Sequence, residues 1–268
     1  MQSYEFLKAW RERARTWQAK VPAPASMPND VAMDGAVLAG DPMVTLVQPV
    51  LPADLFAGAV ADVAGLLAAY RAGDEAKAPA AIAAVVGGAS ADDRAALVAA
   101  VLTEGGVAAW AAAHQVDPTL LGTVAGLALQ PFMARFAVAV TAEAPLGMWR
   151  RNYCPTCGSP ADVCRIDTDN IRMLHCPTCD TQWEHHRLTC VNCDTEDTQK
   201  VNILTVETLE PWRVEVCEVC GGYTKSLDQR HGGHLAMPSV DLFLEDARTL
   251  ALDVLAEQEG YRRGGRVQ

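Results

Sequence analysis

The sequence predicts an α+β protein: an N-terminal α-helical domain, two tandem metal-ribbon β modules and a C-terminal helix. Three observations support this fold class. Residues 52–144 are rich in Ala, Leu and Val at helical spacing. Four Cys-x-x-Cys pairs follow one another between Cys154 and Cys220, separated by runs typical of strands. A last segment again has helical spacing. The predicted parts are 1–148 for the helical domain, 149–189 and 190–237 for the ribbons, and 238–268 for the helix and tail.

Composition predicts a folded cytoplasmic protein. The chain has 268 residues, half of them hydrophobic, which is enough for a sizeable core and two units. Met1–Lys20 carries charges throughout and has no apolar signal core, so we expect no export. The longest uncharged stretch, between Asp117 and Arg135, is broken by Gln130-Pro131. It is shorter than the roughly 20 apolar residues of a membrane helix, which predicts a core helix instead.

The helical domain can be divided by its start and stop signals. Tyr4–Lys20 is an amphipathic helix, and the proline-containing segment 21–30 is a linker. Ala32–Leu51 has no assigned structure. We expect the remaining helices to be bounded as follows: from a cap at Asp54 to Gly73, from a cap at Ser90 to Gly105-Gly106, and from the Asp117-Pro118 start to a kink or division at Pro131. His114 is expected to be a capping or half-buried residue.

The eight paired cysteines predict two metal sites. They are Cys154, Cys157, Cys176, Cys179, Cys190, Cys193, Cys217 and Cys220. Two residues between cysteines let both sulfurs of a tight turn face one ion, and two such turns complete a tetrahedral site. Gly158 and Gly221 follow their pairs, where such a turn often needs a positive φ.

Spacer lengths predict which pairs combine. Eighteen residues separate the first two pairs and twenty-three the last two, and each spacer holds two strand-like runs around a turn. These runs are Ala161–Asp167 and Ile171–His175 in the first spacer, and Lys200–Glu207 and Trp212–Val216 in the second. The ten-residue middle spacer has room for one strand, Thr181–Leu188. Sequential ribbons are therefore expected, with an interleaved arrangement as the alternative.

The sequence disfavours other roles for these cysteines and for the nearby histidines. Disulfides suit exported proteins, and four pairs at hairpin spacing disfavour a redox motif. Cys164 is alone on a predicted strand and is expected to be a small buried hydrophobe. Three histidines near the cysteines (His175, His185 and His186) are expected on strands or as hydrogen-bond donors around the metals. A loop at 230–234 holds His231 and His234, too few for a metal site.

The chain is expected to close with one helix, Leu242–Glu259, stopped by Gly260. Its apolar stripe is predicted as Ala247, Leu250, Ala251, Val254 and Leu255, with Glu245, Asp246, Asp253 and Glu257 facing water. The segment 262–265 is expected to be a frayed end.

Beyond these patterns, the chain resembles a known family between Trp149 and Arg263. The resemblance is carried by Tyr153-Cys-Pro-Thr-Cys-Gly-Ser-Pro160, Leu174-His-Cys-Pro-Thr-Cys-Asp-Thr-Gln-Trp183, Cys190-Val-Asn-Cys193, Cys217-Glu-Val-Cys-Gly-Gly-Tyr-Thr-Lys225 and Glu257-Gln-Glu-Gly-Tyr-Arg262. These residues resemble formate dehydrogenase accessory proteins of the FdhE type. The first 51 residues depart from the long N-terminal region associated with that family.

The resemblance implies an accessory factor rather than an enzyme. Such a factor binds the catalytic subunit of a respiratory formate dehydrogenase in the cytoplasm, before export, and is needed for its maturation to activity. It also implies rubredoxin-like metal sites with the eight paired cysteines as ligands, which slightly favours iron. The residues themselves leave zinc and iron open, because four thiolates suit both.

Two other classes of function remain as alternatives. One is a zinc ribbon that binds nucleic acid, and the other is a rubredoxin-like redox carrier. Residues 154–230 hold seven Lys and Arg against thirteen Asp and Glu, and the whole chain has a net charge of −11. A phosphate-binding surface needs clustered positive charge, so we expect no nucleic-acid partner.

Overall fold

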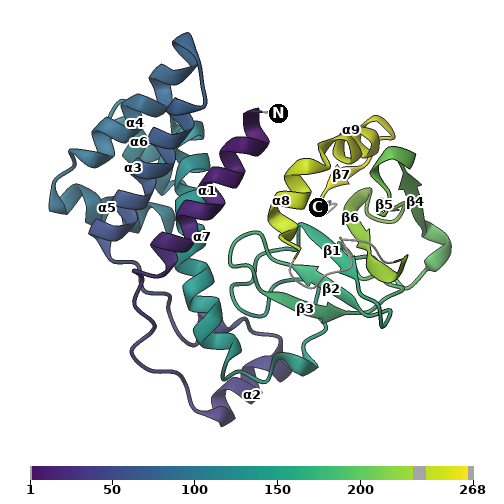
Figure 1. Ribbon diagram of the computed structural model, residues 1–268. Helices are drawn as coiled ribbons and strands as arrows, with labels where there is room; N and C mark the ends of the chain where they lie inside the picture. The colour runs from purple at the N-terminus through teal and green to yellow at the C-terminus, as the bar shows by residue number, and fades with distance from the viewer. Residues whose placement is uncertain (1, 232–239, 265–268) are drawn as a thin grey trace. The chain divides into compact units, whose positions relative to one another are not determined.

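The computed structural model describes residues 2–231 and 240–264, and the chain forms two compact units (Figure 1). The first comprises Met1–Ala25 and Gln48–Ala139, and the second comprises Ser26–Val47 and Val140–Gln268. The segment 26–47, which the sequence placed with the helices, thus belongs to the unit that contains the cysteines. The predicted boundary at 237 and His234 lie outside the described residues.

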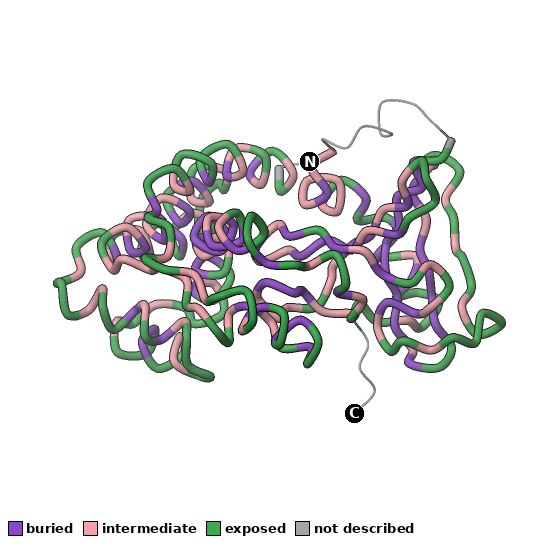
Figure 2. Tube along the Cα trace, turned by 90° about the horizontal axis from the view of Figure 1, so that it is seen from below, coloured by how far each residue is buried: buried purple, intermediate pink, exposed green. Residues whose placement is uncertain are grey.

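The first unit is helical. Its elements are α1 (Gln2–Gln18), α3 (Ala53–Ala69), a 3-10 turn (Gly73–Ala76), α4 (Lys77–Gly87), α5 (Ala91–Val101), α6 (Gly106–Ala113) and α7 (Pro118–Thr141). Buried and exposed stretches alternate along these helices (Figure 2). Their buried stripes share one core that includes Trp10, Phe56, Val60, Ile82 and Phe132. Small alanines between these large side chains allow the helices to approach closely.

Two predicted helix starts are confirmed by their caps. Ser90 Oγ accepts from the Asp93 N–H at 3.1 Å, and Asp117 Oδ1 accepts from the Leu120 N–H at 2.6 Å. Each side chain satisfies a backbone donor that the first helical turn leaves free. His114 is half-buried, and its ring stacks on Trp110 at the end of α6, as predicted.

Three other boundaries were predicted wrongly. Pro52, and not Asp54, precedes α3, and Asp54 lies in the first turn and pairs with Arg94. The helix ends at Ala69 because the chain turns at Tyr70 before reaching Gly73. Gly105 does not end a helix: with a φ of 72°, it is the residue before α6. Of the two outcomes predicted at Pro131, a kink or a division of the helix, the division is ruled out, because Pro131 lies inside a continuous α7.

In the described part of the chain, α7 is the one helix long and apolar enough to span a bilayer. Of its most apolar window, 61% is buried within the protein.

The second unit is built on a seven-stranded sheet. Its strands are β1 (Val163–Ile166), β2 (Arg172–His175), β3 (Gln182–His185), β4 (Val201–Thr205), β5 (Trp212–Cys217), β6 (Gly222–Asp228) and β7 (Arg262–Arg263). The order is β3-β2-β1-β6-β5-β4, and β7 also pairs with β6. The predicted hairpins β1–β2 and β4–β5 are antiparallel, as their turns require.

The two predicted ribbons are joined in one sheet, because β1 and β6 pair in parallel from Val163↔Lys225 to Ile166↔Asp228. Strand β6 was not predicted from the sequence. Its central residues Thr224, Lys225 and Ser226 are polar, although every residue of the strand is buried. A strand that is polar and buried lacks the alternation that marks a half-exposed strand.

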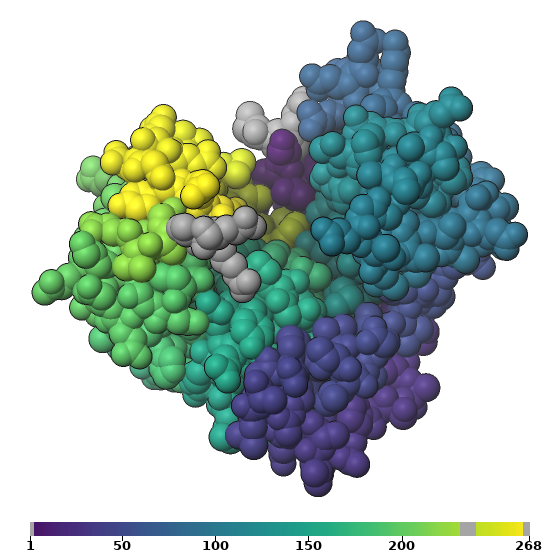
Figure 3. All heavy atoms as spheres, turned by 180° about the vertical axis from the view of Figure 1, so that it is seen from behind, coloured from purple at the N-terminus to yellow at the C-terminus, as the bar shows by residue number. Residues whose placement is uncertain are grey.

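One face of the sheet is covered by α8 (Leu242–Arg248) and α9 (Leu250–Gln258), which are yellow in Figure 3 beside the light-green strands. The predicted single helix is broken at Thr249, whose hydroxyl donates to the Glu245 carbonyl. The break changes which side is buried. Leu250 and Val254 are 55% and 52% exposed, while Leu252 and Ala256 enter the core.

Asp253, predicted to face water, is buried instead. Lys225 Nζ lies 2.6 Å from both Asp246 Oδ1 and Asp253 Oδ2, and the Tyr223 hydroxyl donates to Asp253 at 2.9 Å. Arg263 pairs with the same two carboxylates, so Arg262–Arg263 forms β7 and is not frayed. Gly265 lies outside the described residues.

The unassigned segment forms α2 (Asp30–Ala39) and a 3-10 turn (Met43–Thr45). Asn29 caps α2 by accepting from the Ala32 N–H. The Met43 and Val44 N–H groups donate to the Pro155 and Thr156 carbonyls at 2.8 and 2.9 Å. This segment therefore binds the backbone of the first Cys-x-x-Cys turn.

The buried lysine gives a test of the sheet–helix packing. Lys225→Ala leaves Asp246 and Asp253 with the partly exposed Arg263 as their one remaining ion-pair partner among the described residues, and we expect it to lower the free energy of unfolding by about 3–5 kcal/mol. The matched control is Lys200→Ala, which removes an exposed pair with Glu218 and should cost about 0–1 kcal/mol. Chemical denaturation at constant metal content measures both. Equal losses in the two variants would contradict the predicted role of burial.

Candidate metal centres

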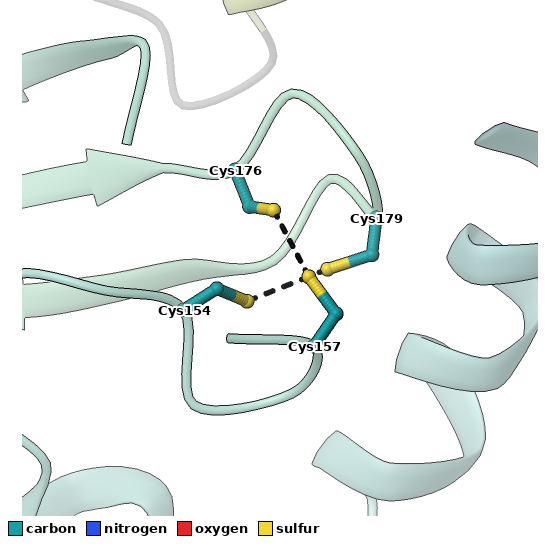
Figure 4. A group of neighbouring side chains, drawn as sticks. All are labelled: Cys154, Cys157, Cys176 and Cys179. Atoms are coloured by element: carbon teal, nitrogen blue, oxygen red, sulfur yellow. Dashed lines mark hydrogen bonds between the residues drawn. The ribbon is translucent and has the colours of Figure 1, made fainter. Parts of the chain in front are cut away.

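The first centre is formed by the first and second Cys-x-x-Cys pairs. The sulfurs of Cys154, Cys157, Cys176 and Cys179 all lie within 4.8 Å of one another and point toward a common centre (Figure 4). Cys154 Sγ is 3.5 Å from Cys179 Sγ, and Cys157 Sγ is 3.4 Å from Cys176 Sγ. When four sulfurs surround an ion tetrahedrally at about 2.3 Å, neighbouring sulfurs are about 3.8 Å apart. The distances in this group are close to that value, so it has the dimensions of a metal site.

The second centre is formed by the third and fourth pairs. Cys190, Cys193, Cys217 and Cys220 also lie within 4.8 Å of one another. The distances from Cys190 Sγ to Cys220 Sγ and from Cys193 Sγ to Cys217 Sγ are both 3.9 Å. The cysteines are thus grouped sequentially, as the spacers predict, and not interleaved.

All four Cys-x-x-Cys turns have the same backbone geometry. The residue after the second cysteine has a positive φ: 78° at Gly158, 60° at Asp180, 56° at Asp194 and 64° at Gly221. In each turn the N–H of this residue donates to the carbonyl of the first cysteine at 2.9–3.0 Å. The glycines were predicted for this position. The two aspartates were not, although aspartate is one of the residues that tolerates this conformation.

Two buried histidines hold these aspartates. His175, on β2, lies 3.2 Å from Asp180 and 2.9 Å from Asp162, and His185, on β3, lies 3.0 Å from Asp194. Burial alone would lower the pKa of His175, but Asp162 and Asp180 outweigh it and raise the pKa to about 9. The histidines therefore fix the turns through the aspartates. Among the described residues, both groups of candidate metal ligands consist of cysteines alone.

The surroundings of the two centres differ. Around the first, hydroxyls are close to sulfur: Ser159 Oγ is 3.4 Å from Cys157 Sγ, and Thr181 Oγ1 is 3.1 Å from Cys179 Sγ. At the second, the Asn192 N–H donates to Cys190 Sγ at 3.3 Å, and Cys193 is exposed. Such contacts stabilise thiolate charge and orient the sulfurs.

The thiolates need a cation. Burial raises the pKa of Cys190, and that of Cys220 to about 11. Four thiolates at one point repel one another, so they gather there only when an ion offsets their charge. The donor set and its spacing fit a divalent zinc or iron ion. Four sulfurs in a tetrahedron do not separate the two metals.

Cys164 lies apart from both groups. It is fully buried on β1, opposite Leu174 and Ser226, and burial raises its pKa to about 11. It remains a neutral thiol at neutral pH, which agrees with the predicted role of a small buried hydrophobe.

Comparison with known proteins points to one family. Residues 188–267 match the family described as "FdhE, C-terminal domain". A "Protein FdhE homolog" of Aquifex aeolicus (strain VF5) is 34% identical over 137 residues, or 50% of this chain and 46% of that protein. "Protein FdhE" of Escherichia coli O1:K1 / APEC is 35% identical over 118 residues, or 42% of this chain and 36% of that protein. The matches thus span less than half the length of these relatives.

A solved structure has the same fold. The crystal structure of the FdhE protein from Pseudomonas aeruginosa is similar with a TM-score of 0.63 at 24% sequence identity. The match covers 96% of this chain and 85% of that one. Together these similarities confirm the resemblance to FdhE-type proteins and the α+β fold class that the sequence predicts.

The ligand set can be tested one site at a time. Cys176→Ser removes one of the four thiolates of the first centre, so we expect metal content to fall by one ion per chain. Metal binding supplies much of the folding energy of such units, so this centre should also lose stability. Metal analysis combined with alkylation and mass spectrometry locates the loss: Cys154, Cys157 and Cys179 should react while the second group stays protected. Reactive cysteines in the second group instead would overturn the assignment.

Cys164 provides the matched control. Cys164→Ala removes a buried sulfur that belongs to neither group, so both ions should be retained. The free energy of unfolding should fall by about 1 kcal/mol, the cost of a small cavity. Loss of an ion in this variant would mean that Cys164 takes part in coordination.

Proposed function

We propose that this protein is an accessory factor that binds the catalytic subunit of a respiratory formate dehydrogenase in the cytoplasm and assists its maturation. The observation that carries the proposal is the pair of four-cysteine centres, built on repeated turns in a chain similar to FdhE proteins. The client follows from that similarity alone. The protein itself is proposed to be no enzyme, since the resemblance is to an accessory factor.

The two centres are proposed to hold one metal ion each. The ligands are Cys154, Cys157, Cys176 and Cys179 in one and Cys190, Cys193, Cys217 and Cys220 in the other. Family resemblance slightly favours iron over zinc. Each ion would fix two turns at the ends of strands, so the sheet offers a rigid surface to a client. An iron centre would also respond to oxygen or to redox state.

Charge supports a basic segment of the client as the first point of contact. The net charge of the chain is −11, and each four-thiolate site with a divalent ion adds about −2 to its surroundings. Complementary charge mainly increases the rate and the selectivity of encounter. Capture should weaken with rising salt, since screening acts over about 8–10 Å at physiological ionic strength.

A redox carrier is the second candidate, and one observation favours it. Cys193 of the second centre is exposed, which gives an electron-transfer partner access to a ligand sulfur. Reversible one-electron cycling of an iron-loaded protein, with transfer to a partner, would support this role. A metal that does not respond to reductants would support the structural role.

Deletion and complementation test the accessory function. We expect deletion of the gene in its host to abolish most formate oxidation at the membrane and to lower the abundance of mature catalytic subunit. The wild-type gene and Cys164→Ala should restore both, and Cys176→Ser should not. Affinity capture of tagged protein should retrieve the catalytic subunit at low salt.

Full formate oxidation in the deletion strain, with no catalytic subunit captured, would overturn the proposal. Binding of duplex or single-stranded nucleic acid at physiological salt would then favour the ribbon as a nucleic-acid module.

A further inference from the structure

Strand β4 forms one edge of the sheet. It is the last strand in the order β3-β2-β1-β6-β5-β4, and among the described residues it pairs with β5 alone (Figure 1). It spans Val201–Thr205, and Ile203 at its centre is 53% exposed. An edge strand presents a row of backbone donors and acceptors with which another extended chain can pair.

The register shows which backbone groups of β4 point outward. The Glu218 N–H donates to the Lys200 carbonyl at 2.9 Å, which extends the β4–β5 register by one residue. In an antiparallel pair, hydrogen-bonded and non-hydrogen-bonded residue pairs alternate along the strands. The N–H and C=O groups that point away from β5 are therefore those of Val201, Ile203 and Thr205.

The sequence of β4 does not protect this edge. Natural edge strands often carry a charge or a proline that stops another strand from pairing. Residues 201–205 are Val-Asn-Ile-Leu-Thr, without charge or proline. The opposite edge strand, β3, contains Glu184, which pairs with Arg150 at 2.8 Å, and Trp183, which donates to the Arg151 carbonyl. Of these two edges, β4 is therefore the one less protected against pairing.

Exposed acidic residues flank β4 at both ends. They are Glu196 and Asp197 before the strand and Glu207 and Glu210 after it. The one basic residue in 195–210 is Lys200, which already pairs with Glu218 at 3.1 Å. Two copies of this edge side by side would bring like charges together. The flanks therefore oppose pairing between copies of the chain and favour a basic partner.

The side chains beside β4 indicate what the middle of the partner contains. Ile203 lines a cavity of about 140 Å³ with Arg187 and with Leu188, which is 67% exposed. Alternate side chains of an added strand would lie on this face of the sheet. Ile203 and Leu188 favour apolar side chains there, whereas Arg187 disfavours basic ones.

We propose that β4 binds an extended basic segment of a polypeptide as an added strand of the sheet. The backbone of the segment pairs with Val201, Ile203 and Thr205. Its central side chains on the Ile203 face are apolar, and its basic residues lie beyond the ends of β4, near the acidic flanks. This assignment rests on the proposed function, because the segment is taken to belong to the client.

Fluorescence anisotropy with the metal-loaded full-length protein tests the edge. The probe is a labelled peptide of alternating valine and threonine with lysines at both ends. Two comparison peptides have glutamates in place of the lysines, or methyl groups on alternate backbone nitrogens. We expect the lysine peptide to bind, more weakly as salt rises, and both comparison peptides to bind about tenfold more weakly or less.

Ile203→Pro should weaken binding of the lysine peptide about tenfold or more, because it removes an outward N–H. Proline is tolerated at an edge position whose N–H faces solvent, so the metals and the β4–β5 pairing should be retained. The matched control is Ile203→Val, which keeps the N–H and an apolar side chain and should bind as the wild type does.

A charge test leaves the backbone of β4 unchanged. Glu207→Gln combined with Glu210→Gln should weaken binding of the lysine peptide about threefold or more. The matched control combines Glu12→Gln with Glu104→Gln, which removes two exposed charges from the first unit and should bind as the wild type does.

Three results would overturn the proposal. One is equally tight binding of the glutamate and lysine peptides, and another is unchanged binding by both the Ile203→Pro and the Glu207/Glu210 variants. The third is a wild-type dimer that Ile203→Pro converts to a monomer in light scattering, which would assign the edge to a second copy of the chain.

Affinity capture separates this edge from the proposed function. Equal capture of the client by wild type and Ile203→Pro would overturn β4 as the contact and leave the accessory role standing. Peptide binding that Ile203→Pro abolishes, with no client captured by the wild type, would support the edge and overturn the accessory role.

Discussion

The second unit depends on the convergence of four cysteine sulfurs at each of two points. The sulfurs of each centre come from turns 19 or more residues apart in the sequence, and thiolates repel one another. Each centre joins the two ends of a hairpin, β1–β2 in one case and β4–β5 in the other. An ion that offsets the four negative charges therefore holds the two turns of each centre together. The short strands alone do not stabilise the closed loop between these turns.

The rest of the unit is arranged so that this convergence is fixed in one geometry. The parallel pairing of β1 with β6 makes the two hairpins a single sheet, so both centres lie on one backbone framework. His175 and His185 hold the strained aspartates of two turns. The segment 40–47 adds backbone hydrogen bonds to the first turn, and the Tyr153 hydroxyl donates to the Gly40 carbonyl at 2.7 Å. Burial on one face is supplied by α8 and α9.

The sequence predicts what is encoded locally. Cysteine spacing predicts the two groups of four. Ser90 and Asp117 can be recognised as helix caps from the sequence, because a cap and the N–H that it accepts from are only three residues apart. Features that depend on distant partners were missed. Asp253 looks like a surface residue until Lys225, 28 residues away, is placed beside it. The same pairing explains the polar strand β6, whose Lys225 is buried only because two carboxylates meet it. Asp180 and Asp194 could have been recognised, because they occupy the position that glycine takes in the other two turns.

Charge is distributed unevenly, and this has a consequence for any partner. Residues 154–230 hold thirteen acidic side chains, yet their arginines gather at one end of the sheet, where Arg172, Arg187, Arg213 and Arg230 influence one another. The positive charge is therefore local, and the carboxylates of Glu215 and Asp228 lie among these arginines. A nucleic-acid backbone needs positive charge spread along an exposed surface, whereas Arg172 is 2% exposed and pairs with Glu215, so this cluster does not by itself provide such a surface. The ion pairs that these arginines make with Glu215 and Asp228 instead join β2 to β5 and β5 to β6 within the sheet.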